Sequence, residues 1–143
     1  MEQKNCARAL DRPITAQQID SLLSFLEVFE QPGFDFGKWQ SPKGQLPFCE
    51  LSEWATNFLQ ALRENGWVSS FDWLAWQHVA AQYVASPDQI ASADTETIRK
   101  LFTTHAERER FREGSLFAMF ENGQIVALLQ RLKMIRGEMA GQK

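Results

Sequence analysis

The segment HAERERFRE, residues 105–113, holds the densest group of charged side chains in the chain. A helix would place Arg108 and Arg112 on one face, because they are four residues apart. A guanidinium group binds phosphate or carboxylate through paired hydrogen bonds, so Arg108, Arg110 and Arg112 are candidate residues for binding an anionic ligand. The more common reason for such a segment is a solvated surface whose arginines pair with neighbouring carboxylates.

His105 and Glu113 are weak candidates for catalysis in the same segment. Acid–base chemistry by an imidazole requires a carboxylate or a nucleophile within hydrogen-bond reach, and spacing alone does not place one. Because His105 lies on an apolar helical stripe, the alternative is a half-buried histidine that is hydrogen-bonded within the fold. The second histidine is His78, and no cysteine–histidine spacing typical of zinc occurs, so we expect no metal. Glycine-rich nucleotide-binding motifs are also absent, and we expect no cofactor.

Asp72, Trp73 and Trp76 form a second candidate ligand-binding group. Aromatic faces beside a carboxylate can wall a pocket for a ligand. Asp72 is also a good N-cap for a helix that starts after it, and the tryptophans fit the buried side of that helix. This structural interpretation explains both features, and it is the one we favour.

Composition and charge restrict the classes of function. The chain has 143 residues, 44% of them hydrophobic, which is sufficient for one domain with a sizeable core. A net charge of −3 argues against binding of nucleic acid or of a membrane through the overall field. Residues 99–136 nevertheless carry 8 basic and 4 acidic side chains, so a local positive face, with binding to a nucleic-acid backbone, remains an alternative.

The cysteines and the hydropathy favour a cytoplasmic protein. Cys6 and Cys49 belong to no C-x-x-C pair, and a reducing compartment is the simpler interpretation. We find no apolar region typical of a secretory signal near residue 1 and no run of 18 apolar residues, so we expect no membrane association. Cys49 just precedes a predicted helix, which is a weak argument for a nucleophile; a buried, unreactive thiol is the preferred interpretation.

The candidate residues must be positioned by helices. Capping residues predict helices that start after Thr15, Ser52, Asp72 and Asp94, and glycine or proline pairs end them. Residues 87–93 predict one further helical turn. Residues 115–120 form a short apolar segment between breaks at Gly114 and at residues 122–123. A last helix would carry basic residues near its C-terminus, where they complement the dipole: Arg131, Lys133 and Arg136. The predicted fold is a single all-α bundle of five to six short helices over residues 14–139, after a flexible lead-in of residues 1–13.

Two of these helices are predicted to bury tryptophan. The helix after Ser52 would turn Trp54 inward together with Phe58 and Leu62, and the helix after Asp72 would bury a stripe of five residues: Trp76, Val79, Ala80, Tyr83 and Val84.

The segment between the first two helices, residues 32–51, is rich in glycine, proline and aromatic residues. Phe34 and Phe36 are predicted to pair with the strand around Phe48 in a small β-hairpin, with a turn at residues 41–44. An ordered loop of this length is often functional, so it is a candidate lid or groove wall.

Four segments together resemble a family of small bacterial proteins, the domain of unknown function 6508, over nearly the whole chain after about residue 20. They are LLSFLEVFEQPGF, PFCELSEWATNFLQALRENGW, SSFDWLAWQ and LFTTHAERERFREGSLFAMFENGQIVALLQRL. The most specific pieces are FDW at residues 71–73 and RFREG at residues 110–114. The resemblance implies a bacterial or archaeal cytoplasmic protein with distinctive polar residues around Asp72 and Arg110. It carries no activity, so no catalytic residue follows from it.

The leading hypothesis is a small helical domain that binds a partner protein or an anionic ligand. Its candidate surface combines Asp72, Trp73 and Trp76 with His105, Arg108, Arg110 and Arg112. The first alternative is an enzyme on a small anionic substrate, with His105 or Glu113 as acid or base. Binding of nucleic acid through residues 99–136 is the third hypothesis, and the five tryptophans leave room for an apolar homodimer face.

Overall fold

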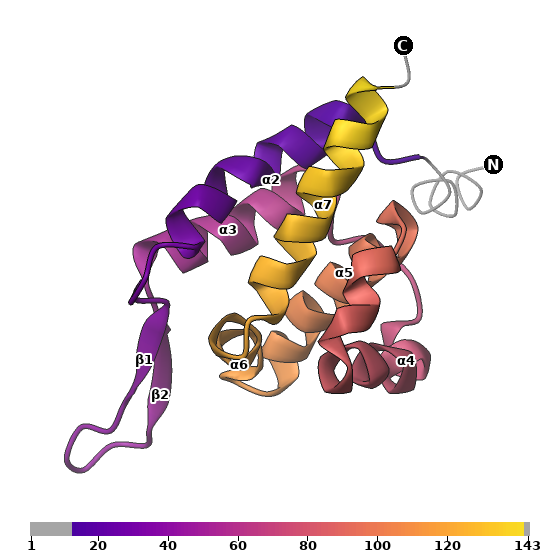
Figure 1. Ribbon diagram of the computed structural model, residues 1–143. Helices are drawn as coiled ribbons and strands as arrows, with labels where there is room; N and C mark the ends of the chain where they lie inside the picture. The colour runs from indigo at the N-terminus through magenta and orange to yellow at the C-terminus, as the bar shows by residue number, and fades with distance from the viewer. Residues whose placement is uncertain (1–12, 142–143) are drawn as a thin grey trace.

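Helices form most of the computed structural model, which describes residues 13–141 (Figure 1). Within this range there are six α-helices, one 3-10 helix and one β-hairpin. In chain order they are α2 (Ala16–Phe29), β1 (Gly37–Gln40), β2 (Phe48–Leu51), α3 (Glu53–Glu64), α4 (Trp73–Ala85), η1 (Pro87–Ser92), α5 (Thr95–Phe111), α6 (Ser115–Glu121) and α7 (Gln124–Ala140). The predicted all-α bundle with a small hairpin is confirmed.

The four predicted helix starts are confirmed by their capping hydrogen bonds. The side chains of Thr15, Ser52, Asp72 and Asp94 each accept a hydrogen bond from a backbone N–H in the first turn of α2, α3, α4 and α5. Thr15 forms a complete capping box with Gln18. These caps depend on residues close in sequence, which explains why the pattern predicted them correctly.

One hydrophobic core joins the helices. α2 packs most extensively against α7 and also against α3, and Figure 1 shows these three helices side by side. Phe29 at the end of α2 contacts five other rings, with centroids 5.4–5.9 Å away: Phe25, Phe34, Phe36, Phe58 and Phe120. Each such contact adds about 0.5–1.5 kcal/mol to the burial itself. This ring cluster therefore attaches the loop after α2 to the core.

The same cluster explains why the hairpin starts later than predicted. Phe34 and Phe36 were expected in the first strand, but their rings pack on Phe29 in the core. The strands are Gly37–Gln40 and Phe48–Leu51, paired antiparallel with Trp39 opposite Cys49. The hairpin then extends away from the helices (Figure 1), and Leu46 near its tip is 86% exposed.

The two predicted tryptophan stripes are buried only in part. Trp54 at the start of α3 is 45% exposed and makes an edge contact with the Phe25 ring. In α4, Ala80 is fully buried, whereas the other four residues of the expected stripe, Trp76, Val79, Tyr83 and Val84, are half-buried. α4 lies at the edge of the bundle (Figure 1), so its apolar face has too little protein to cover it.

The C-terminal helix also differs from the prediction. α7 continues to Ala140, so Arg131, Lys133 and Arg136 lie within the helix and its last turn contains no basic residue. Of the expected lead-in, residues 1–12, with Cys6, lie outside the described residues. None of the helices in the described part of the chain is both long enough and apolar enough to cross a membrane.

The Asp94 cap offers a test of this fold. Asp94 accepts a 2.8 Å hydrogen bond from the Thr97 N–H, and hydrogen bonds to Thr97 lower the pKa of Asp94 below its ordinary 3.8. A lowered folded-state pKa adds stability that is present above the ordinary value and is lost as the pH falls through the folded-state value. We expect Asp94→Ala to cost about 1 kcal/mol of unfolding free energy near pH 7, and less below the ordinary pKa.

Urea denaturation near pH 7 and at a pH below the ordinary pKa of Asp94 measures the stability lost in Asp94→Ala at each pH. Asp88→Ala is the matched control, because Asp88 lies in η1 and, within residues 13–141, its side chain accepts no hydrogen bond. A cost for Asp94→Ala that does not change with pH would contradict the prediction.

Candidate functional site

The site lies at the corner where α5 ends and α6 begins. Gly114 adopts a left-handed conformation there, with φ of 93°. The Glu109 carboxylate accepts hydrogen bonds from the backbone N–H groups of Gly114 and Leu116, at 3.1 and 2.9 Å. These donors would otherwise lack partners at the start of α6, so Glu109 fixes the angle between the two helices.

A cavity of about 280 Å³ opens at this corner, and we call it the corner cavity. Its walls come from α5, α6 and the hairpin. The lining residues are Trp39, His105, Arg108, Arg112, Glu113, Gly114, Ser115, Ala118 and Met119.

Arg108 and Arg112 both line the corner cavity, although Arg112 is the extended C-cap that follows α5 and not a residue of the helix. Arg108 is half-buried and Arg112 is exposed. Within residues 13–141 neither side chain forms an ion pair or a hydrogen bond with another residue. Two guanidinium groups are therefore available to a ligand in the cavity.

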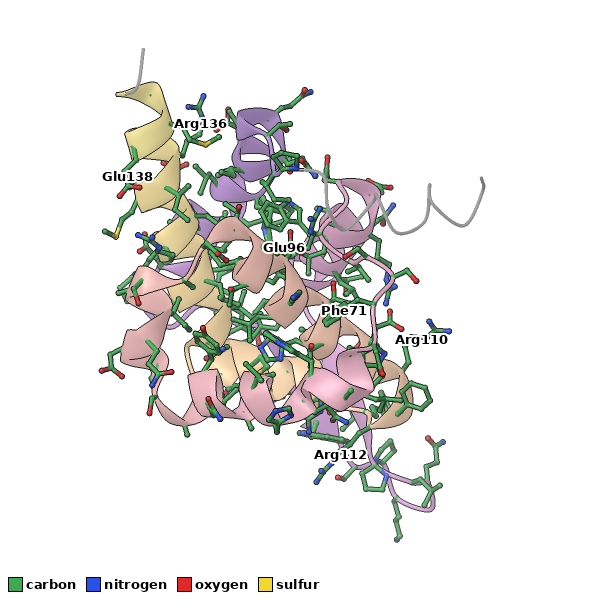
Figure 2. The ribbon with its side chains drawn as sticks, turned by 90° about the vertical axis from the view of Figure 1, so that its right-hand side faces the viewer. Phe71, Glu96, Arg110, Arg112, Arg136 and Glu138 are labelled. Carbon is green, nitrogen blue, oxygen red and sulfur yellow. The ribbon has the colours of Figure 1, made fainter. Side chains whose placement is uncertain are left out.

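Arg110 does not line the cavity with the other two arginines. It forms an ion pair with Glu107 at 3.2 Å, and Glu107 also reaches Arg63 at 3.5 Å. Figure 2 shows Arg110 and Arg112 pointing in different directions from the end of α5. Arg110 thus matches the alternative interpretation, a solvated charged surface.

His105 is more deeply buried than expected, with 2% of its surface exposed. Burial, together with the nearby charge of Arg108, lowers the pKa of His105 to about 3. The imidazole is therefore neutral near pH 7. The hydrogen-bonded histidine of the alternative interpretation is absent: Nε2 of His105 has no hydrogen-bond partner in the described part of the chain. A buried polar atom of this kind calls for a ligand or a water molecule.

The β-hairpin supplies one wall of the corner cavity. The Glu113 carboxylate accepts a 3.0 Å hydrogen bond from the backbone N–H of Cys49, and this contact ties β2 to the corner. Trp39 on β1 packs directly over Gly114, where a side chain would overlap the indole ring. Trp39 was not predicted as a site residue, because nothing in the local sequence indicates that the hairpin reaches the end of α5. Ser115, the first residue of α6, was not predicted either.

Cys49 has the environment of an unreactive thiol. Its side chain is half-buried, and burial raises its pKa, with the carboxylates of Glu109 and Glu113 adding to the effect. A nucleophilic cysteine requires the opposite, a cationic environment that lowers the pKa.

The candidate residues of α4 separate into two groups. The Asp72 side chain caps α4, and Trp76 packs on Phe71 beneath the Lys100 ammonium, 5.9 Å from the ring. Trp73 faces the end of α5 and contacts the Phe111 ring at 5.8 Å. No ion pair or hydrogen bond joins Asp72 to Arg110 within the described range.

A second depression therefore lies between α4 and the end of α5, with a volume of about 370 Å³. We call it the α4–α5 groove; it is lined by Trp73, Leu74, Gln77, Arg108, Phe111 and Arg112. Of the residues proposed from the sequence, Trp73, Arg108 and Arg112 meet here, and His105, Glu113, Arg108 and Arg112 meet in the corner cavity.

The basic residues of segment 99–136 do not form one stripe. Arg99 is buried and pairs with Glu96 at 2.6 Å, and Nε of Arg131 donates to a backbone carbonyl at 2.8 Å. Arg136 pairs with Asp20 at 2.9 Å and lies at the opposite end of the molecule from Arg112 (Figure 2). Among residues 13–141 no group of three or more His, Cys, Asp or Glu side chains could hold a metal ion.

These features define a small helical domain with a hairpin and a polar cavity at a helix corner. The chain belongs to the family of unknown function DUF6508, whose model matches residues 14–138. No curated protein and no solved structure gives a significant match to the chain.

The buried imidazole predicts a pH dependence of stability. The unfolded chain binds a proton at His105 near the ordinary pKa of 6.5, whereas the folded protein does not until about pH 3. Stability should therefore fall as the pH is lowered between these values, by about 1.4 kcal/mol per pH unit from this residue.

The variant His105→Gln lacks this contribution. Urea denaturation at several pH values between pH 7 and pH 4 gives the slope of the unfolding free energy against pH, which should be smaller in the variant than in the wild type. His78→Gln, at an exposed histidine, is the control and should keep the slope of the wild type. Equal slopes in all three proteins would exclude the buried neutral state.

A second prediction concerns the contact between the hairpin and the corner. Gly114 and Gly123 both have positive φ values, 93° and 85°, but a side chain at Gly123 would meet no atom within 4 Å. Gly123→Ala should lower the unfolding free energy by about 1 kcal/mol, from backbone strain alone. Gly114→Ala should lower the unfolding free energy by more than this, because the added methyl group also displaces the indole ring of Trp39. Thermal unfolding compares the two, and an equal loss would show that Trp39 moves without cost.

Proposed function

We propose that this domain binds a small anionic ligand, a carboxylate or a phosphate, in the corner cavity. The observation that carries the proposal is the combination of two arginines without ion-pair partners in residues 13–141 and a neutral, buried His105 around one cavity. The arginines attract the anion, and the imidazole and the Ser115 hydroxyl are further polar groups in the wall.

The charge of the cavity wall supports an anion although Glu113 also lines it. Two arginines against one glutamate, with a neutral histidine, leave a net charge of +1 among the lining residues. One oxygen of Glu113 is already bound to the Cys49 N–H. The volume of about 280 Å³ lies just below the range usual for drug-sized ligands, which favours a ligand of few atoms.

The physical chemistry supports binding more than acid–base catalysis. A general base works best when its pKa lies near the working pH, and His105, with a pKa of about 3, is a weak base near pH 7. A neutral imidazole still serves as a hydrogen-bond partner for a bound ligand. The cytoplasm is the compartment that we propose, because the free thiol of Cys49 suits a reducing environment.

The proposal predicts that inorganic phosphate stabilises the protein through Arg108. Thermal unfolding in sodium phosphate, compared with sodium chloride at equal ionic strength, should show a higher midpoint that rises with phosphate concentration. Arg108→Met keeps an unbranched apolar side chain in place of the aliphatic part of arginine and removes the guanidinium charge, so it should weaken phosphate binding about tenfold or more.

Arg110→Met is the matched control, since Arg110 lies two residues away on α5, pairs with Glu107 and does not line the cavity. It should respond to phosphate as the wild type does. The proposal fails if phosphate has no concentration-dependent effect, or if both variants respond equally. Calorimetric titration with succinate tests the carboxylate class in the same three proteins.

A further inference from the structure

The α4–α5 groove exposes large apolar side chains next to one another. Phe111 is 78% exposed and Leu74 is 62% exposed, and both line the groove together with Trp73. Single exposed apolar residues are ordinary, but a contiguous group in a depression marks a surface that binds something. The corner cavity does not account for this group, because none of these three residues lines it.

The charges around the groove indicate what its occupant carries. Arg108 and Arg112 line it, and no carboxylate is among the lining residues that the structure describes. Arg108 has two acidic neighbours along the chain: Glu107 is paired with Arg110 and Arg63, and the Glu109 carboxylate accepts hydrogen bonds from the backbone N–H groups of Gly114 and Leu116. An occupant that is both apolar and negatively charged would therefore complement the groove.

Two other occupants fit this surface less well. A second copy docked about a two-fold axis would bring the arginines of both copies toward one another, and like charges at an interface are unfavourable. An anionic membrane attracts a protein by only about 1 kcal/mol for each nearby Arg or Lys, and this protein has a net charge of −3. The surface is also a depression between two helices, which receives a projecting side chain better than a flat bilayer.

We propose that the α4–α5 groove docks an acidic segment of a partner protein that carries an apolar anchor. The anchor side chain inserts between Trp73, Leu74 and Phe111, and flanking Asp or Glu residues pair with Arg108 and Arg112. Aromatic and arginine residues of this kind dominate the binding energy of protein interfaces. Trp73 is half-buried and Leu74 is exposed on the side of α4 that lines the groove, and the partner would cover both.

A random-peptide display library, selected on the immobilised full-length protein, tests the proposal. The enriched peptides should combine Asp or Glu with a nearby aromatic or aliphatic residue. Synthetic peptides of the enriched sequence should lose about tenfold or more in affinity for Phe111→Ser and for Leu74→Ser, because each change removes an exposed contact without touching the core. Replacing the acidic residues of the peptide by their amides should also weaken binding.

Leu46→Ser is the matched control, since Leu46 is also an exposed apolar residue but lies near the hairpin tip. It should bind the peptides as the wild type does. Three outcomes overturn the proposal: no peptide is enriched, the enriched peptides lack acidic residues, or their affinity is unchanged in Phe111→Ser.

Light scattering and vesicle sedimentation distinguish the other occupants. A wild-type dimer that Phe111→Ser dissociates would assign the groove to a second copy, and binding to anionic vesicles that Phe111→Ser abolishes would assign it to a membrane. Either result overturns the peptide proposal. Phosphate stabilisation should persist in Phe111→Ser, so the corner cavity and the groove are tested separately.

Discussion

The hydrogen bonds from Gly114 and Leu116 to the Glu109 carboxylate determine the geometry of the whole site. They satisfy backbone donors at the start of α6 with a side chain from the last turns of α5. The corner that results holds Arg112 and Glu113 beside the cavity, and it leaves Phe111 exposed on the other side. A change in the angle between α5 and α6 would alter both the corner cavity and the α4–α5 groove, because Arg108 and Arg112 line both of them.

The hairpin is attached to the helices in two places by different interactions. At its base, the rings of Phe34 and Phe36 are buried against Phe29 and hold the chain through apolar packing. Along the strands, the bond from Cys49 N–H to Glu113 and the stacking of Trp39 over Gly114 bring it to the α5–α6 corner. The cavity wall thus depends on an element that lies more than 50 residues earlier in the chain.

Burial and charge together give His105 its character. The protein surrounds the imidazole and places Arg108 nearby, and both effects favour the neutral form. A guanidinium group is always protonated in proteins, so Arg108 and Arg112 bring positive charge to the same cavity. The cavity therefore combines permanent positive charge with a neutral polar group, which suits recognition of an anion without exchange of protons.

The sequence by itself determined the helices, their caps and the family, because a cap, a glycine stop and an apolar stripe are interactions between residues a few positions apart. The four-residue spacing of Arg108 and Arg112 likewise predicted that they share a surface. Tertiary structure alone decided that Arg110 turns away to Glu107, that Asp72 and Trp76 stay outside the site, and that Trp39 from the hairpin closes the cavity. It also decided the burial of His105 and the exposure of Phe111, although both lie on α5. The physical reason is that burial, and with it the pKa and the availability of each group, depends on which distant elements cover a residue, and local periodicity contains no information about them.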